Sequence, residues 1–276
     1  MRVCTNSVQK YYLKGTKMTD LSITIVAYKN YEDIINAVKS IEKYTSQLIK
    51  KRIYIVDNSE YSDAQKKDFK YNLSKYIDVK YIDTGKNLGF GKGNNYIINE
   101  IDSKYHAIVN PDILLKEDSF SKIIDYMEKN SDVGMCIPKL IDEHNNIQKA
   151  YRRELTIWDM FVRMFMKNCF KKRQDFHTMQ DMDYSKPFKV PFGQGSFLVI
   201  RTNLFRQLNG FDDRYFMYLE DADLCKRVNK VSSLMYFPYT EVMHKWEKGS
   251  HKNLKLLKIH LQSALKYFKK WGFKFK

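Results

Sequence analysis

Carboxylates beside turns are the side chains best suited to chemistry in this 276-residue sequence. Asp112 follows Pro111, directly after the short apolar run 107–109. Proline fits poorly inside a central strand, so we expect the strand to end here, at the edge where open α/β sheets bind their ligands. One carboxylate at such an edge can ligate Mg²⁺ or Mn²⁺, which complete their shells with water and substrate phosphates. The alternative is an Asx turn or a cap for a helix from Lys116 onward.

A second acidic group lies further along the chain, where Glu220, Asp221 and Asp223 fall within four residues. Close to the first carboxylate, this group could supply a base that removes a proton from a substrate. The alternative is structural, because acidic side chains in the first turn of a helix interact favourably with its dipole. His244 follows the predicted strand 234–237 and is either a metal ligand or an ordinary polar loop residue.

Glycines are concentrated at 87–95, where Gly89, Gly91 and Gly93 alternate with other residues. This spacing differs from the dinucleotide fingerprint and follows the third predicted strand instead of the first, so a Rossmann dehydrogenase is not indicated. Glycines at these positions would let the backbone approach a phosphate or a sugar closely, and Lys92 could add positive charge. The alternative is a flexible turn that caps the next helix.

Four short apolar segments in the first half have the length and composition of buried strands, and helical patterns separate them. They lie at 21–27, 52–56, 79–82 and 107–109. This alternation is typical of an α/β fold with a mostly parallel, Rossmann-like central sheet of the doubly wound type, flanked by helices.

The net charge of +16 calls for an acidic partner, which could be nucleic acid, an anionic membrane or a phosphorylated substrate. Positive charge is concentrated at 167–173 and from residue 245 to the end, beside apolar residues. The segment 155–166 is apolar around most of a helix, relieved by Asp159 and Arg163 at i and i+4. Basic and apolar residues together predict helices that lie on a membrane surface. The alternative for 155–166 is a core helix followed by a solvated loop.

The remaining composition excludes several classes of protein. The four cysteines are far apart and form no Cys-x-x-Cys pair, which argues against a zinc ribbon or a disulfide framework and suits a reducing cytosol. No run approaches 18 apolar residues, so we expect no membrane-spanning helix. The polar segment 174–186 is predicted to be a mobile loop.

The order of these motifs is specific. Read along the chain they are IVDNS, NLGFGKGNN, NPD, GQGSF, YLEDADLCKR and a late His with a downstream Ser. This pattern resembles family 2 glycosyltransferases of the GT-A fold, in particular the rhamnosyltransferase-type branch that builds bacterial O-antigen and capsule. The resemblance covers residues 21–250 and implies a GT-A catalytic domain there. Residues 1–20 would be an N-terminal extension, and 251–276 a C-terminal basic amphipathic helix.

The resemblance also implies roles for individual residues. Asp221 corresponds to the catalytic base, and Glu220 would orient it or the acceptor. The metal ligands would be Asp112 and His244; the family often has Asp-x-Asp where this chain has Asn110-Pro111-Asp112. The nucleotide-sugar side would comprise Ala27, Tyr28, Asp57, Asn87, Gly89, Asn94 and Asn110. The acceptor side would comprise Gly195, Ser196 and Arg227.

The implied reaction is an inverting transfer of a sugar from a nucleotide donor, with Mn²⁺ or Mg²⁺ as cofactor. L-rhamnose from dTDP-rhamnose is the favoured donor sugar, and a UDP-hexose such as UDP-glucose or UDP-galactose is the alternative. The acceptor would be a saccharide on polyprenyl diphosphate, in the synthesis of a cell-surface polysaccharide. We therefore expect a cytoplasmic enzyme that associates peripherally with the inner face of the plasma membrane. The anionic surface of the membrane would attract the basic enzyme.

Two other classes of function remain as competitors. A nucleotidyltransferase would usually show a glycine- and arginine-rich phosphate loop after the first strand, whereas Tyr28-Lys29-Asn30 stands there. A non-catalytic nucleic-acid-binding protein could use the +16 charge and the 20 tyrosines. No recognised nucleic-acid motif is present and the lysines gather beside leucines, so we expect no nucleic-acid partner.

Overall fold

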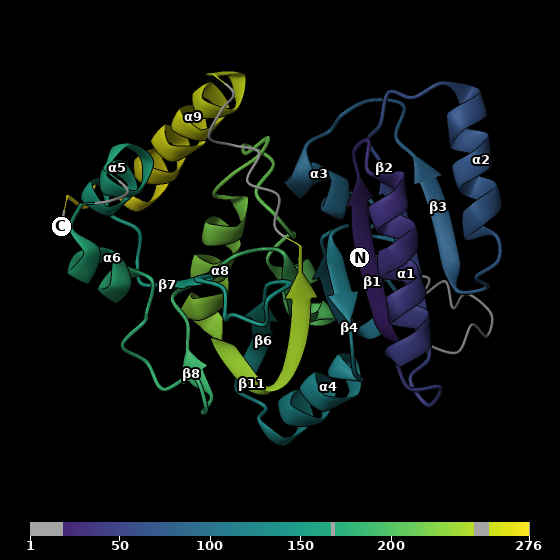
Figure 1. The fold of residues 1–276 in the computed structure, drawn as a ribbon, viewed down its shortest axis with the longest axis horizontal. Coiled ribbons are helices and arrows are strands. Elements are labelled where there is room, and N and C mark those ends of the chain that lie inside the picture. Colours follow the sequence, from purple (N-terminus) through teal and green to yellow (C-terminus); the bar gives the residue numbers. More distant parts are fainter. Residues whose placement is uncertain (1–18, 167–168, 246–253, 276) are drawn as a thin grey trace, which may run out of the picture.

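A nine-stranded mixed sheet forms the centre of the molecule, and helices pack against it (Figure 1). The computed structural model describes residues 19–166, 169–245 and 254–275. The order of the strands is β3-β2-β1-β4-β10-β6-β11-β5, with β8 paired to β11, while β7 and β9 form a separate two-stranded sheet. The strands are β1 (Thr19–Ala27), β2 (Lys51–Asp57), β3 (Val79–Asp83), β4 (Ser103–Val109), β5 (Ile113–Leu115), β6 (Val133–Ile141), β7 (Tyr151–Arg152), β8 (Phe188–Lys189), β9 (Phe192–Gly193), β10 (Phe197–Arg201) and β11 (Ser233–His244).

Helices occupy most of the connections between these strands. They are α1 (Tyr31–Tyr44), α2 (Asp63–Leu73), α3 (Phe90–Asn95), α4 (Ser119–Lys129), α5 (Ile157–Phe165), α6 (Lys171–His177), α7 (Thr202–Gln207), α8 (Glu220–Val231) and α9 (Leu254–Trp271). The predicted α/β class is confirmed, and so is the C-terminal helix.

The first four predicted strands all form, and β1, β2, β3 and β4 run parallel. In β1 every residue from Leu21 to Ala27 is buried, as expected of a strand that is covered on both faces. Ile34, Val38 and Ile41 recur at helical spacing on the buried side of α1. This half of the molecule is therefore the Rossmann-like part that the sequence predicts.

The second half of the sheet departs from a parallel arrangement at β10. This strand runs antiparallel to β4 and to β6, so it lies between them although it comes later in the chain. Phe197 pairs with Val109, and the N–H of Asn110 donates to the carbonyl of Ser196 at 2.8 Å. The end of β4 and the start of β10 therefore meet, although 86 residues separate Asn110 from Ser196 in the sequence.

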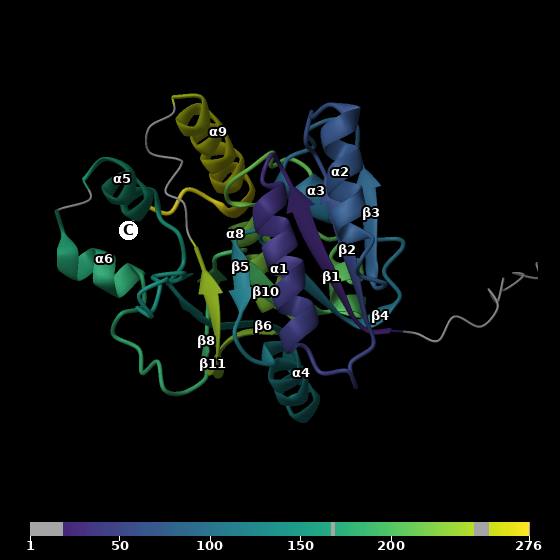
Figure 2. The ribbon, with the colours of Figure 1, turned by 45° about the vertical axis from the view of Figure 1, so that its right-hand side comes forward.

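Helices α5, α6 and α9 gather at the end of the molecule far from α2 and β3 (Figures 1 and 2). The prediction of a mobile loop at 174–186 is wrong, because α6 occupies part of it and His177 and Met179 are buried. The predicted i,i+4 pair on α5 is also absent, since Asp159 binds Arg173 at 2.6 Å instead of Arg163.

The C-terminal helix α9 packs against the rest of the fold instead of standing apart. Its buried face contains Ser263, Ala264, Tyr267 and Phe268, while Leu254 remains exposed. The predicted boundary at residue 250 and residues 1–18 of the predicted extension 1–20 lie outside the described residues. The extension is two residues shorter than predicted, because Thr19 and Asp20 belong to β1. None of the described helices is both long enough and apolar enough to cross a membrane.

Candidate active site

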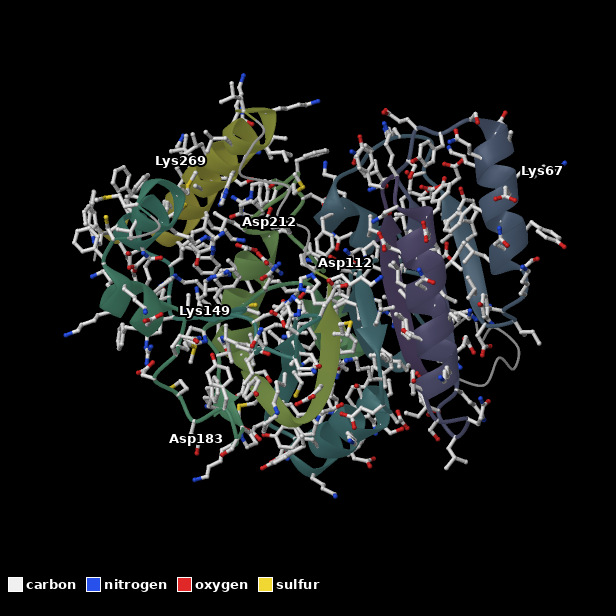
Figure 3. The ribbon with its side chains drawn as sticks, in the orientation of Figure 1. Lys67, Asp112, Lys149, Asp183, Asp212 and Lys269 are labelled. Atoms are coloured by element: carbon white, nitrogen blue, oxygen red, sulfur yellow. The ribbon has the colours of Figure 1, made fainter. Side chains whose placement is uncertain are left out.

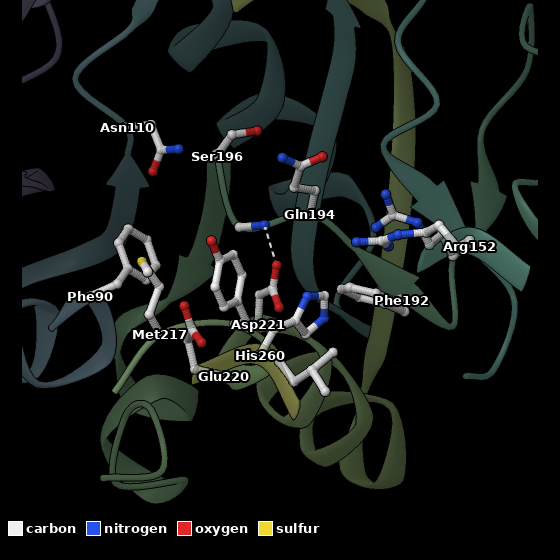
Figure 4. Close-up of a pocket in the computed structure, with 14 residues that line it drawn as sticks. Phe90, Asn110, Arg152, Phe192, Gln194, Ser196, Met217, Glu220, Asp221 and His260 are labelled. Atoms are coloured by element: carbon white, nitrogen blue, oxygen red, sulfur yellow. Dashed lines mark hydrogen bonds between the residues drawn. The ribbon is translucent and has the colours of Figure 1, made fainter. Parts of the chain in front are cut away.

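A pocket of about 280 Å³ opens where the turn after β4, the turn before β10 and the start of α8 meet (Figure 4). Helices α5 and α9 contribute to its wall through Arg163 and His260. The lining residues are Phe90, Asn110, Arg152, Arg163, Phe192, Gln194, Gly195, Ser196, Met217, Tyr218, Leu219, Glu220, Asp221 and His260. The pocket thus contains five residues that the sequence singles out: Asn110, Gly195, Ser196, Glu220 and Asp221.

Asp221 is held at the centre of this pocket by backbone hydrogen bonds. Its Oδ2 accepts the N–H of Gly195 at 3.0 Å, and its Oδ1 accepts the N–H of Ala222 at 2.8 Å (Figure 4). A Cβ at position 195 would lie 3.0 Å from the Cβ of Asp221, so glycine permits this close approach. Tyr218 and Leu219 both have positive φ, at 72° and 64°, a conformation that is strained for side-chain-bearing residues and common at functional sites.

Glu220 and Asp221 form a buried acidic pair whose members differ in protonation. Burial and, after it, repulsion by Asp221 together raise the pKa of Glu220 to about 8. Burial also raises the pKa of Asp221, but two backbone N–H groups and the charges of Arg152 and Arg163 oppose that rise. The backbone N–H groups and the two arginines thus favour ionisation of Asp221 over ionisation of Glu220.

Asp112 and His244 lie side by side, as the strand pairing requires. In the antiparallel pair of β11 and β5, His244 stands opposite Ile113, and its Nε2 is 3.3 Å from Oδ2 of Asp112. Gln148 fixes the imidazole: its Nε2 donates to the His244 carbonyl at 2.7 Å, and its Oε1 lies 2.8 Å from Nδ1. Nδ1 therefore donates to Gln148, and Nε2 faces the Asp112 carboxylate.

The surroundings of this pair suit a divalent cation. Asp112 lies at the tip of β11 near the centre of the molecule (Figure 3), and its buried Oδ1 has no hydrogen-bond partner within the described ranges. The described residues contain no cluster of three or more acidic, histidine or cysteine side chains that could hold a metal. A cation bound to Asp112 and His244 would therefore take its other ligands from water and substrate phosphates.

The glycine-rich segment is a turn that fits against the loop before α8. Gly89 has φ +81°, and a Cβ there would lie 2.1 Å from the carbonyl oxygen of Phe216. The side chain of Asn87 accepts the N–H of Gly89 at 2.9 Å and closes the turn. The buried Asn94 donates to the carbonyl of Phe90 at 3.0 Å, so both asparagines serve the turn itself.

Asp57 is buried at the end of β2 and does not line the pocket. Its carboxylate accepts the hydroxyl of Tyr31 at 2.5 Å, the hydroxyl of Tyr81 at 2.7 Å and the N–H of Ser59 at 2.8 Å. In this structure it ties α1 and β3 to the end of β2 instead of facing the pocket. Ala27 is likewise buried, whereas the neighbouring Tyr28 is 45% exposed.

Arg227, predicted on the acceptor side, points into the fold and does not line this pocket. Its guanidinium binds the buried Asp223 at 2.7 Å and donates to the carbonyls of Leu208 and Gly210, so its donors are used within the fold and it does not line the pocket. Asp223 also accepts the indole N–H of Trp271 at 2.8 Å and pairs with Lys270 at 2.6 Å. The third carboxylate of the acidic group therefore anchors α9 to α8 and is structural.

Sequence reasoning missed four polar side chains in the pocket wall: Arg152, Arg163, Gln194 and His260. Gln194 lies within the GQGSF motif, which was a usable signal. His260 stacks on Tyr218 with ring centroids 4.6 Å apart, a contact made across the fold between α9 and the loop before α8. No local pattern marks the two arginines, which come together only through the placement of β7 and α5.

The fold and the pocket together define a GT-A-type glycosyltransferase, and the comparisons with known proteins agree. The family model "Glycosyl transferase family 2" matches residues 22–208. The chain belongs to glycosyltransferase family 2, and the predicted resemblance is confirmed.

Two relatives of this chain are named as glycosyltransferases. "Rhamnosyltransferase WbbL" of Escherichia coli (strain K12) is 29% identical over 203 residues, which are 70% of this chain and 74% of that protein. "N-acetylglucosaminyl-diphospho-decaprenol L-rhamnosyltransferase" of Mycobacterium tuberculosis (strain ATCC 25618 / H37Rv) is 27% identical, over 62% of this chain and 60% of that one. The match thus spans less than two thirds of the mycobacterial enzyme.

Two solved structures share the fold at low sequence identity. One is that of GalNAc-T7 with UDP, GalNAc and Mn²⁺, which has a TM-score of 0.65 and 15% identity and covers 86% of this chain and 45% of that one. The other is a mannosyltransferase from Pyrobaculum calidifontis in complex with GDP-Man and Mn²⁺, with a TM-score of 0.65 and 13% identity, covering 92% and 65%. These neighbours support the fold.

Proposed function

We propose that this chain is an inverting glycosyltransferase that moves a sugar, L-rhamnose from dTDP-rhamnose being the favoured case, from a nucleotide donor to a lipid-linked saccharide. One observation carries the proposal: Asp221 stands in the pocket as the more readily ionised member of a buried acidic pair, held by the Gly195 N–H. This is the arrangement that a positioned general base requires.

In the proposed reaction, Asp221 accepts the proton of an acceptor hydroxyl. The hydroxyl oxygen forms a bond to the anomeric carbon of the donor sugar while the bond from that carbon to the nucleoside diphosphate breaks. The nucleophile attacks from the face opposite the leaving group, so the anomeric configuration inverts. Glu220, neutral at pH 7, adds no second negative charge beside the attacking oxygen. A base positioned in this way contributes about 10²- to 10⁴-fold in rate.

Asp112 and His244 are the residues that would hold a divalent cation, and the unpartnered Oδ1 of Asp112 and the oriented Nε2 of His244 fit that role. Such a cation supplies positive charge that balances the charge growing on the departing diphosphate. A carboxylate with an imidazole favours Mn²⁺ over Mg²⁺, because imidazole is a better ligand for the softer ion.

The choice of substrates is supported by the named relatives. One is a rhamnosyltransferase, and the other is named as acting on a sugar joined through diphosphate to a decaprenol lipid. We carry both features to this chain: a deoxyhexose donor and a polyprenyl-diphosphate acceptor. A UDP-hexose donor on the same site remains the second candidate.

An outer surface formed by α5, α6 and α9 supports attachment to an anionic membrane. Exposed apolar side chains and exposed lysines both occur along these helices, and we call this set of residues the basic apolar face. Its members are Phe161, Phe170, Lys171, Lys172, Phe176, Leu254, Lys255, Lys258, Leu261, Leu265 and Lys269. Each lysine near an anionic surface adds about 1 kcal/mol of attraction. We propose that this face holds the enzyme at the inner leaflet, where its acceptor is anchored.

A donor panel tests the proposed function. Purified protein with Mn²⁺ or Mg²⁺ is given dTDP-rhamnose, UDP-glucose, UDP-galactose or UDP-N-acetylglucosamine, with and without a lipid-diphosphate-linked sugar. We expect acceptor-dependent release of nucleoside diphosphate from one donor, and its loss in Asp221→Asn. Silence across the panel together with no binding of any of these nucleotides would refute the proposal.

A further inference from the structure

Two arginines in the pocket wall, Arg152 and Arg163, form no ion pair with a carboxylate among the described residues. Other arginines nearby in the sequence do form such pairs. Arg152 is 7% exposed, its Nε is buried without a hydrogen-bond partner, and its guanidinium lies 5.2 Å from the ring centroid of Phe192. Arg163 lines the same pocket from α5. In the part of the chain that the structure describes, neither side chain forms an ion pair with a carboxylate.

Neighbouring arginines show that acidic partners were available. Asp159, four residues before Arg163 on the same helix, binds Arg173 at 2.6 Å. Arg153, adjacent to Arg152, forms a two-pronged ion pair with Asp181 at 2.8 and 2.7 Å. The fold thus places these carboxylates beside arginines outside the pocket and leaves the two inside it uncompensated.

A pair of cations, one buried and one half-buried, is unfavourable when only one nearby carboxylate offsets its charge. Burial and, to a smaller extent, the nearby charge of Arg163 lower the pKa of Arg152 to about 9, although the charge of Asp221 opposes this shift. A single carboxylate cannot neutralise two guanidinium groups. The pocket therefore has an unmet requirement for negative charge, which a ligand with at least one phosphate would satisfy through paired N–H···O bonds.

The position of the two arginines identifies which phosphate this is. Figure 4 places Arg152 on the opposite side of Asp221 from Asn110, the residue of the metal-binding turn. In an inverting displacement the donor diphosphate leaves from the face opposite the base, toward Asp112. The side beyond Asp221 is left for the acceptor, whose own diphosphate is joined to the sugar that carries the attacking hydroxyl.

The helix that carries Arg163 also faces outward with apolar side chains. Trp158 and Phe161 stack on α5 with ring centroids 5.9 Å apart, and Phe161 is 43% exposed. One helix thus presents a cation to the pocket and an exposed aromatic side chain to solvent, at the end of the molecule where α9 also lies (Figure 1). An anion joined to an apolar chain matches both features, whereas a free anion matches only the first.

We propose that Arg152 and Arg163 bind the diphosphate of the lipid-linked acceptor and so place its sugar hydroxyl at Asp221. This inference rests on the proposed function and assigns the acceptor subsite within it. Arg152 and Arg163 are specificity-determining residues for acceptors with a diphosphate between lipid and sugar.

Calorimetric binding of farnesyl diphosphate, a short lipid diphosphate, tests the subsite without requiring turnover. Charge-assisted hydrogen bonds to phosphate predict that Arg163→Gln and Arg152→Gln each weaken binding about 10- to 100-fold. Arg153→Gln is the matched control, because its guanidinium is engaged by Asp181 outside the pocket, and it should bind farnesyl diphosphate as the parent does. Affinity for dTDP or UDP with Mn²⁺ should stay within twofold in all three variants.

Three results would overturn the inference. Farnesyl diphosphate binding within twofold of the parent in both pocket variants would show that the arginines do not bind it. An equal loss of dTDP and UDP binding would place the pair on the donor diphosphate. Inorganic diphosphate binding as tightly as farnesyl diphosphate would show a free-anion site without a lipid component.

The design also separates this inference from the proposed function. If no donor in the panel is turned over but Arg163→Gln still weakens farnesyl diphosphate binding, the proposed function fails and the anion subsite stands. If transfer proceeds with an unchanged KM for the lipid-linked acceptor in Arg163→Gln, the subsite fails and the transferase stands. Because Arg152 packs on Phe192, thermal unfolding of its variant is measured first, and the half-buried Arg163 provides the test if Arg152→Gln does not fold.

Discussion

Replacing Asp221 with asparagine should abolish most transfer while leaving the pocket intact. Asparagine has nearly the same shape, and its side-chain oxygen can still accept the N–H of Gly195, which lies 3.0 Å from the carboxylate in the parent. What it cannot do is accept the acceptor proton. We expect a fall of about 10²- to 10⁴-fold in kcat, which corresponds to about 3–5 kcal/mol of barrier.

The same substitution should not destabilise the protein. Burial raises the folded-state pKa of Asp221, so the parent loses stability as pH rises from the unfolded-state pKa through the folded-state value. At neutral pH the parent carries this penalty, whereas the uncharged side chain of Asp221→Asn is free of it. The thermal midpoint of the variant at pH 7 should therefore equal or exceed that of the parent, and it should decrease less as the pH rises above the unfolded-state pKa of the carboxyl group.

Three measurements decide this prediction: single-turnover transfer, calorimetric binding of the donor nucleotide with Mn²⁺, and thermal unfolding. Asp125→Asn, on the exposed side of α4, is the control for loss of one carboxylate. Near-normal transfer in Asp221→Asn would show that another group is the base. A lower thermal midpoint, or a loss of nucleotide binding comparable to the loss of transfer, would show a structural role instead.

Four further changes probe the surrounding structure. Asp112→Ala should lose Mn²⁺-dependent nucleotide binding by calorimetry; unchanged binding with and without EDTA would contradict the metal assignment. In the parent, stability should fall between about pH 4.5 and pH 8, because the pKa of Glu220 is raised to about 8 in the folded state, and Glu220→Gln should remove this fall. In urea unfolding at pH 8 the free energy of unfolding of the variant should exceed that of the parent by about 3–5 kcal/mol. An equal pH dependence in the two proteins would contradict the raised pKa. Asp223→Asn should cost about 3 kcal/mol in urea unfolding, because it leaves Arg227 and Lys270 without their shared buried carboxylate; a change within about 0.5 kcal/mol, the usual range for exposed positions, would argue against its anchoring role. Replacing Lys255, Lys258 and Lys269 with glutamine should weaken sedimentation with anionic vesicles by about 3 kcal/mol at low salt, while binding that is insensitive to both salt and these changes would contradict the basic apolar face.

Local patterns carried much of the fold because they encode burial directly. The strand at 21–27 could be predicted since all seven of its residues are buried and apolar or small, and the helix at 31–44 since its buried residues recur every three or four positions. The order of the motifs was sufficient to indicate the family. By contrast, β11 extends to His244, well past the apolar core at 234–237, because its later residues gain pairing partners in β5 and β6 that no local pattern reveals.

The candidate site likewise contains residues that the sequence could single out and residues whose contacts only the structure shows. Asp112, Glu220 and Asp221 stand at turns or helix starts that the sequence marks, so they could be singled out as candidate site residues. The roles of their neighbours could not be predicted, because Asp223 differs from Asp221 only in pointing toward Lys270 and Trp271 of α9. Arg227 seemed an acceptor ligand by position, but its donors bind groups inside the fold.

The sequence by itself determined the alternation of strands and helices, the positions of the acidic and glycine-rich turns, and the family, because each depends on residues close together in the chain. Only the tertiary structure decided which side chains share the pocket. Arg152 arrives there through the pairing of β7 with β9, Arg163 through α5 and His260 through α9. Contacts between residues far apart in sequence depend on how buried surfaces fit together, and that fit is a property of the whole fold.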